Sequence, residues 1–184
     1  MGKEYEVKVR VNDLSRVRAN IVRLGGSLLA AYSEEDYYVD LRNCVSVAYK
    51  DLVFRVRIRE VNGVVEGELT LKGPKKTLQT FRVRDELNIK IEKPYELVNF
   101  LRNLTFKTLK VSKVREIYSL KGFKIFLDRV SCLGSFIEVE LDEVEDLAVA
   151  EEKLNKLLKE LEAGQEVVSK SYAEMLMEVM DCEE

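Results

Sequence analysis

A chain of 184 residues with 46% hydrophobic residues can bury a full core, and a single domain is expected at this length. The sequence contains no histidine, which excludes the serine and cysteine triads that depend on it and removes the commonest ligand of zinc. The net charge of −3 hides an asymmetry, since residues 1–137 carry 26 basic and 17 acidic side chains, which fits either a polyanionic ligand or a charged, thermophile-like surface.

Strict alternation of charged and apolar residues predicts most of the strands. In chain order, these strands are expected near residues 3–12, 53–60, 65–72, 80–91, 122–128 and 135–142. Two less regular segments, at 27–40 and 105–120, are further candidates. The chain is therefore expected to contain eight strands, each long enough to take part in one extended sheet.

Helices are expected between and after the strands, at residues 13–24, 94–104 and 143–163, and from Ser171 onward. Asn12 or Asp13 is the expected cap of the first helix, and Pro94 takes the first position of the second. A stripe of leucines marks the third helix, which Gly164 should end. The spacing of Ser171 and Glu174 is typical of a capping box at the start of the fourth.

We expect one domain over residues 1–184, because two prolines and no low-complexity run leave no linker. Residues 1–142 would supply the sheet and its two inserted helices. Residues 143–184 would form the C-terminal helices, which are expected to plug or buttress the sheet or to support a homodimer.

The strands carry their charges on one face. Because successive side chains of a strand point to opposite faces, Glu4, Glu6 and Lys8 share one side of the first strand. One interpretation is an open antiparallel sheet whose charged face is solvated and whose apolar face rests on the helices. The interpretation we favour is an α+β fold, a closed eight-stranded antiparallel β-barrel with flanking helices, in which the charged face turns inward.

Charges inside a barrel require counter-charges or a ligand, because an unpaired buried charge costs several kcal/mol. Arginine and lysine side chains match phosphate oxygens, whereas carboxylates hold divalent cations through hard oxygen ligands. The basic strands near 53–60 and 80–90 and the acidic strand near 135–142 could supply both parts. A triphosphate with Mg²⁺ or Mn²⁺ is therefore the expected ligand.

The segment Glu4-Tyr5-Glu6-Val7-Lys8 resembles the ExExK signature of the CYTH superfamily of triphosphate tunnel proteins. The motifs that follow it in order strengthen the resemblance: an arginine strand, Leu69-Thr70-Leu71-Lys72-Gly73-Pro74, Arg84-Asp85-Glu86, Lys113-Val114-Arg115, Leu127-Asp128 and Phe136-Ile137-Glu138-Val139-Glu140. The likeness spans residues 4–140 and is nearest to the class IV adenylate cyclase and thiamine triphosphatase branch. One departure is Asn88, an amide where a second carboxylate of an RxExE pattern is expected.

The resemblance implies a tunnel and assigns roles to its charged residues. Those expected to hold the triphosphate are Arg57, Lys72, Arg84, Lys113 and Arg115. Lys8 and Glu6 are the expected catalytic residues, with Lys8 near the reacting end. The expected metal ligands are Glu4, Glu6, Glu138 and Glu140, with Glu86 and Asp128 as further candidates for holding metal or orienting basic residues. Arg55, Arg59 and Arg82 share the same face without an assigned role.

Three functions follow from this resemblance. The first is an adenylate cyclase that converts ATP to cyclic AMP and pyrophosphate. The second is a triphosphatase in which water attacks the terminal phosphorus of inorganic triphosphate, thiamine triphosphate or a nucleoside triphosphate. The third is a polyphosphate- or nucleotide-binding module without turnover. Tyr37, Tyr38 and Tyr118 could stack on a base or thiamine ring, although packing in the core or at the rim is the commoner role of such tyrosines.

Other partners and compartments receive less support. Inward charges in a narrow barrel would not meet a nucleic acid duplex, and no aromatic RNA-binding motif is present. No apolar stretch approaches the roughly 20 residues of a membrane span, and the first residues lack the pattern of a signal peptide, so a cytoplasmic protein is expected. Cys44, Cys132 and Cys182 have no CxxC spacing and are expected to be free thiols.

Overall fold

The computed structural model describes residues 2–42, 51–141, 144, 146–164 and 166–181. Of the expected free thiols, Cys132 is confirmed as free and exposed, whereas Cys44 and Cys182 lie outside the described residues. Among the described residues, no helix is long and apolar enough to cross a lipid bilayer.

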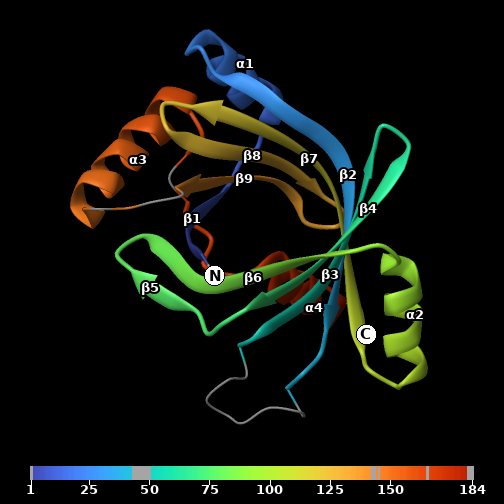
Figure 1. Ribbon diagram of the computed structural model, residues 1–184. Coiled ribbons are helices and arrows are strands. Elements are labelled where there is room, and N and C mark those ends of the chain that lie inside the picture. The colour runs from blue at the N-terminus through green and yellow to red at the C-terminus, as the bar shows by residue number, and fades with distance from the viewer. Residues whose placement is uncertain (1, 43–50, 142–143, 145, 165, 182–184) are drawn as a thin grey trace.

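Eight antiparallel strands close into a barrel (Figure 1). In chain order the strands of the sheet are β1 (Gly2–Arg10), β2 (Ser27–Val39), β3 (Val53–Val61), β4 (Val64–Lys72), β5 (Lys76–Leu78), β6 (Phe81–Ile91), β7 (Thr108–Leu120), β8 (Phe123–Val130) and β9 (Gly134–Leu141). Around the barrel the order is β1-β9-β8-β7-β2-β3-β4-β6, and pairing of β1 with β6 closes the ring. The expected closed barrel is thus confirmed, with the two less regular candidate segments included as β2 and β7.

The short strand β5 was not expected from the sequence. It follows Gly73 and Pro74, at which the pairing of β4 with β6 ends. The last contact of that pairing is the hydrogen bond from the backbone amide of Gly73 to the carbonyl of Asp85, at 2.8 Å. Three residues are too few to show alternation, so tertiary pairing along the same edge of β6 defines this strand.

Four helices flank the strands: α1 (Leu14–Arg23), α2 (Pro94–Asn103), α3 (Leu147–Leu161) and α4 (Tyr172–Asp181). Asp13 caps α1, and Pro94 opens α2 as expected. α3 begins at Leu147 rather than near 143, because Asp146 accepts hydrogen bonds from two backbone amides of the first turn. The capping box before α4 is confirmed, since Ser171 and Glu174 exchange hydrogen bonds between side chain and backbone.

The main hydrophobic core lies outside the barrel, between its wall and the helices. α1 and α3 cover the outward side chains of β1, β7, β8 and β9, and Val9, Ile21 and Leu161 are fully buried there. α2 covers β3 and β4 on another side, around Val56 and Val98. Because the apolar faces of the strands point outward to these helices, the charged faces must point into the barrel.

α4 packs differently from the other helices. Its apolar side chains meet Phe136 and Val111, which share the inward face of their strands with Glu138 and Lys113. Phe136 and Tyr172 pack edge to face, with ring centroids 5.1 Å apart. The two C-terminal helices therefore have separate roles: α3 buttresses the wall, and α4 plugs part of one end of the barrel.

Candidate functional site

The barrel encloses a cavity of about 390 Å³, a size typical of small-molecule sites. Among the described residues, its lining contains ten basic side chains, Lys8, Arg55, Arg57, Arg59, Lys72, Arg82, Arg84, Lys113, Arg115 and Lys124. The acidic lining residues are Glu6, Glu86, Glu138 and Glu140. The excess of positive charge in a partly enclosed space favours a polyanionic ligand.

The structure brings almost all of the sequence-predicted site residues to this cavity. All five expected triphosphate-binding residues line it, as do Lys8, Glu6, Glu86, Glu138 and Glu140. Asp128 lies behind the lining and is fully buried. Glu4 lies in β1 opposite Arg84 of β6, but its side chain is outside the described part of the structure.

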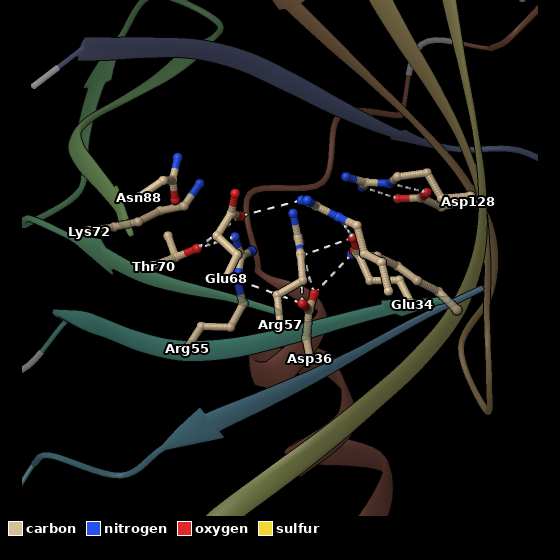
Figure 2. A network of polar contacts seen from close by, with 12 residues as sticks. Glu34, Asp36, Arg55, Arg57, Glu68, Thr70, Lys72, Asn88 and Asp128 are labelled. Carbon is tan, nitrogen blue, oxygen red and sulfur yellow. Dashed lines mark hydrogen bonds and ion pairs between the residues drawn. The ribbon is translucent and has the colours of Figure 1, made fainter. Parts of the chain in front are cut away.

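Two buried carboxylates behind the lining hold the central cations (Figure 2). Asp36 of β2 accepts hydrogen bonds from Arg57 Nε at 2.7 Å and Nη2 at 3.0 Å, and from Lys113 Nζ at 3.0 Å. Glu34, two residues earlier on the same face, lies 2.9 Å from Lys113 Nζ and 3.0 Å from Arg57 Nε. The carboxylates thus fix both cations and offset part of their mutual repulsion.

Arg55 is held more loosely than Arg57. Its Nη2 donates to Thr70 Oγ1 at 2.9 Å, while its Nε lies 3.6 Å from Asp36 Oδ1 and makes no hydrogen bond to a described residue. The side chain is only 8% exposed. A buried guanidinium with an unused donor beside a cavity is suited to bind an anionic oxygen.

A second cluster joins Arg115, Asp128, Glu138 and Lys8. Arg115 Nε donates to Asp128 Oδ1 at 2.7 Å, and its Nη2 bridges Asp128 and Glu138. Glu138 Oε1 lies 3.2 Å from Nζ of Lys8, its direct partner on the neighbouring strand β1. Asp128 therefore contacts a basic residue directly, and the orienting role expected for it from the sequence stays a prediction.

Tyr172 at the start of α4 completes this cluster. Its hydroxyl donates to Asp128 Oδ2 at 2.8 Å, and Lys8 Nζ lies 3.8 Å from the centre of its ring. Lys8 also donates to the carbonyl of Lys170 at 3.4 Å, and Arg82 donates to the carbonyls of Ser169 and Lys170. The approach to α4 is therefore part of the wall of the site.

The remaining predicted residues lie on β4 and β6. Lys72 Nζ lies 2.9 Å from Glu86 Oε2, and Asn88 donates to Glu86 Oε1 at 2.7 Å. The amide at position 88 therefore fixes the Glu86 carboxylate toward Lys72. Arg84 donates to the carbonyls of Asp51 and Gly73, at 2.9 and 3.2 Å.

The carboxylates of β1 and β9 are the candidate ligands of a divalent cation. Glu6 and Glu140 lie directly opposite each other on neighbouring antiparallel strands, and both line the cavity. Like charges in this position destabilise the sheet unless a cation lies nearby, and Arg82 already pairs with Glu6. No three acidic, cysteine or histidine side chains of the described residues gather into a ready metal cluster. The facing carboxylates of Glu6 and Glu140 supply the hard oxygen ligands that magnesium and manganese prefer, so these two residues fit such an ion. The full set of ligands expected from the sequence, Glu4, Glu6, Glu138 and Glu140, stays a prediction.

Buried charges should make stability depend on pH. Burial by itself raises the pKa of Glu34, but the nearby cations Lys113 and Arg57 outweigh this effect. They lower the pKa of Glu34 from its usual 4.5 to about 2. The stabilisation by ionised Glu34 is therefore complete above about pH 4.5 and is lost as the pH falls toward 2.

Between about pH 4.5 and pH 2, we expect the melting temperature of wild type to fall more steeply than that of Glu34→Gln. Glu60→Gln, an exposed change on β3, should keep the wild-type slope, and parallel curves for all three proteins would contradict the assignment.

Three residues of the buried polar network around the cavity escaped the sequence analysis: Glu34, Asp36 and Tyr172. The first two lie within Ser33-Glu34-Glu35-Asp36, where consecutive acids break the alternation, although positions 34, 36 and 38 do share one face. Tyr172 directly follows Ser171 at the start of a helix, where nothing in the local pattern points to a contact with the barrel interior. Of the three tyrosines considered for stacking, only Tyr38 lines the cavity within the described structure, whereas Tyr37 and Tyr118 donate to Glu35 and Glu116.

Comparisons with known proteins agree with this geometry. The family model described as the CYTH domain matches residues 2–172. The solved structure of the PH1819 protein from Pyrococcus horikoshii OT3 is 35% identical with a TM-score of 0.79, and the match covers 95% of this chain and 98% of that one. A protein of Methanocaldococcus jannaschii named "Putative adenylate cyclase MJ0240" is 28% identical over 94% of this chain and 97% of its own length.

HpAC1 from Hippeastrum, a protein whose structural description reports a dominant triphosphatase activity, has the same fold. Its TM-score is 0.67 at 18% identity, with 92% of each chain covered. This likeness concerns the fold alone.

Proposed function

The chain belongs to the CYTH domain family, and from this premise we propose that it is a metal-dependent adenylate cyclase that converts ATP to cyclic AMP and pyrophosphate. The observation that carries the proposal is the enclosed cavity with ten basic and four acidic residues in its described lining. A triphosphate matches this excess of positive charge, and it is long enough to engage basic residues from several strands. The 28% identity to the M. jannaschii relative supports the choice of reaction.

In this proposal the central cations bind the phosphate chain. Arg57 and Lys113 are preorganised by Asp36 and Glu34, so their donors need little rearrangement when the ligand enters. Arg55 contributes an unused donor, and Lys72, Arg84 and Arg115 complete the clamp. The same cations would neutralise the charge that develops on the leaving pyrophosphate.

Glu6 and Glu140, with Glu4 on the same face of β1, would hold the Mg²⁺ or Mn²⁺. When bound, such an ion lowers the pKa of a coordinated hydroxyl and offsets phosphate charge. Glu138 is engaged by Lys8 and Arg115, so we assign it first to orienting these cations.

Lys8 is proposed to act at the reacting end. Burial lowers the pKa of Lys8 although the nearby Glu138 carboxylate opposes this effect. A lysine that gives up its proton more readily than usual is suited to take or hold the proton of the attacking 3′-hydroxyl. Glu138, Tyr172 and the carbonyl of Lys170 fix the position of its amine for this role.

A triphosphatase is the second candidate, because the cationic clamp treats the phosphate groups alike. The basic residues extend from Arg59 to Lys72 along the cavity, and no described lining residue by itself distinguishes the α-phosphorus from the γ-phosphorus. The substrate would then be inorganic triphosphate, thiamine triphosphate or a nucleoside triphosphate. The fold is compatible with this reaction, as the Hippeastrum protein illustrates.

A product assay with ATP, thiamine triphosphate and tripolyphosphate, each with Mn²⁺, tests the proposal. We expect cyclic AMP and pyrophosphate from ATP, and no phosphate release from tripolyphosphate. Glu6→Gln should lower the rate by about 100-fold or more, the size of effect that loss of one transition-state electrostatic contact produces. The variant should still bind tripolyphosphate in EDTA, because the cationic clamp is unchanged.

Glu60→Gln is the matched control, since Glu60 is an exposed residue of β3. Phosphate without cyclic AMP would favour the triphosphatase, and binding without any product would favour a binding module. Full activity of Glu6→Gln would contradict the metal assignment.

A further inference from the structure

Asn88 of β6 is an amide among the charged side chains that line the cavity. Because side chains two positions apart on a strand share a face, Asn88 and Glu86 both point into the barrel. Lys72 of β4 lies directly opposite Glu86, and Thr70 lies directly opposite Asn88. Figure 2 shows Asn88, Thr70 and Lys72 together on this part of the wall. The amide is therefore placed to act on the Glu86 carboxylate and, through it, on Lys72.

Both oxygens of the Glu86 carboxylate have partners on this part of the wall. Asn88 Nδ2 donates to Oε1 at 2.7 Å, and Lys72 Nζ lies 2.9 Å from Oε2. The side chains of Lys72 and Glu86 are only 13% and 15% exposed, so their attraction is weakly screened by salt. The amide group of Asn88 faces the carboxylate with a hydrogen-bond donor, which stabilises the charge of Glu86 but cannot itself bind a cation.

The strand register places Glu86 away from the two carboxylates that fit a divalent ion. Glu6 lies directly opposite Arg82, and Glu86 follows Arg82 along β6 at a distance of roughly 13 Å, from a rise of about 3.3 Å per residue. Asn88 lies still further in the same direction, so its hydrogen bond draws the Glu86 carboxylate away from Glu6. A Mg²⁺ ion holds its oxygen ligands at about 2.0–2.1 Å, and Glu86 held in this way does not share such an ion with Glu6.

We propose that Asn88 is a positioning residue that assigns Glu86 to the cationic clamp, where Glu86 holds Lys72 for the phosphate chain, and that withholds Glu86 from the divalent ion. The inference rests on the proposed function and deepens it, because it separates the carboxylates of the cavity into ion ligands and a clamp anchor. Aspartate at position 88 would remove the donor that engages Glu86 and would place two carboxylates on one face of β6. Such a pair supplies hard oxygen ligands for a divalent ion.

Binding of Mn²⁺ without any triphosphate tests which carboxylates belong to the ion, and calorimetry measures it. In Asn88→Asp we expect the Mn²⁺ affinity to rise about tenfold or more, because a second negative charge replaces the amide donor. The gain should vanish in the double variant Asn88→Asp/Glu86→Gln. Glu86→Gln alone should keep the Mn²⁺ affinity within about twofold of wild type, whereas Glu6→Gln should lower it about tenfold or more.

Binding of tripolyphosphate in EDTA tests the role of Asn88 in the clamp. Asn88→Leu keeps a similar side-chain volume and removes the hydrogen bond to Glu86, so Lys72 loses a fixed partner. We expect tripolyphosphate affinity to fall about 3- to 10-fold, without the rise in Mn²⁺ affinity of Asn88→Asp. A role in stability alone would lower the melting temperature without separating the two ligands in this way.

Asn99→Asp and Asn99→Leu are the matched controls, because Asn99 is exposed on α2 and outside the described lining of the cavity. Both should bind Mn²⁺ and tripolyphosphate as wild type does. An equal rise in Mn²⁺ affinity in Asn99→Asp would show a general effect of net charge and would contradict the inference.

The outcomes separate this inference from the proposed function. Unchanged Mn²⁺ affinity in Asn88→Asp, or a loss in Glu86→Gln as large as that in Glu6→Gln, would overturn the assignment of Glu86. Unchanged tripolyphosphate affinity in Asn88→Leu would overturn the positioning role of Asn88, while tripolyphosphate binding by wild type would still support the proposed function. If wild type binds no tripolyphosphate, the proposed function itself fails.

Discussion

Asp36→Asn is expected to lower the free energy of unfolding by about 3 to 5 kcal/mol in the absence of ligand. Asp36 is fully buried and accepts from Arg57 and Lys113, while Arg55 lies 3.6 Å from it. Asparagine keeps the shape of the side chain but leaves these cations with Glu34 as their nearest carboxylate. For a chain of this size the melting temperature should fall on the order of 10 °C.

A triphosphate should reverse much of this loss. With the carboxylate removed, the central cations repel one another more strongly, and a polyanion in the cavity supplies the missing negative charge. We therefore expect tripolyphosphate to raise the melting temperature of Asp36→Asn more than that of wild type. Thermal melts with and without the ligand measure both effects.

Asp40→Asn is the matched control, because Asp40 directly follows β2, the strand that contains Asp36. Its partner Arg42 has a 61% exposed side chain, and pairs of this kind contribute about 1 kcal/mol or less. An equal loss of stability in Asp36→Asn and Asp40→Asn would show that burial of the cation network has little energetic weight. Ligand stabilisation that is the same in Asp36→Asn and wild type would argue against a polyanion among these cations.

Arg55→Met is expected to weaken triphosphate binding by about 10- to 150-fold, which corresponds to the 1.5 to 3 kcal/mol of a charge-assisted hydrogen bond. Arg55 is the buried lining arginine whose Nε makes no hydrogen bond to a described residue, so its loss should remove a ligand contact more than a structural one. Methionine fills a similar volume, and Asp36 retains Arg57 and Lys113. Stability should therefore change by no more than about 1 kcal/mol.

Calorimetric titration with tripolyphosphate in EDTA measures this effect, and thermal melting checks the fold. Arg129→Met is the control, because Arg129 is exposed on the outer side of β8, next to the inward Asp128. Unchanged affinity in Arg55→Met would exclude Arg55 from the clamp. A comparable loss in Arg129→Met would indicate a general effect of net charge.

Local pattern alone was enough to predict the eight barrel strands. The period-two alternation that places Glu6 and Lys8 on one face of β1 is a property of a single strand and needs no tertiary information. Caps such as Asp13 and the Ser171–Glu174 pair are equally local, and both occur as expected. The apolar faces of the strands must be covered by helices. Because the helices lie outside the barrel, the charged faces of the strands point into it.

The pairing of these charges depended on the tertiary structure. Asp36 meets Lys113, and Tyr172 meets Asp128, only because strand register and the position of α4 bring together residues 77 and 44 positions apart in the chain. The sequence by itself therefore determined which side chains share the charged face of each strand, and the structure decided that this face points into the barrel. Only the closed barrel decided which carboxylates hold which cations and that Arg55 keeps an unused donor. The physical reason is that alternation is encoded within each strand, whereas contacts across the interior depend on ring closure and on the register between strands.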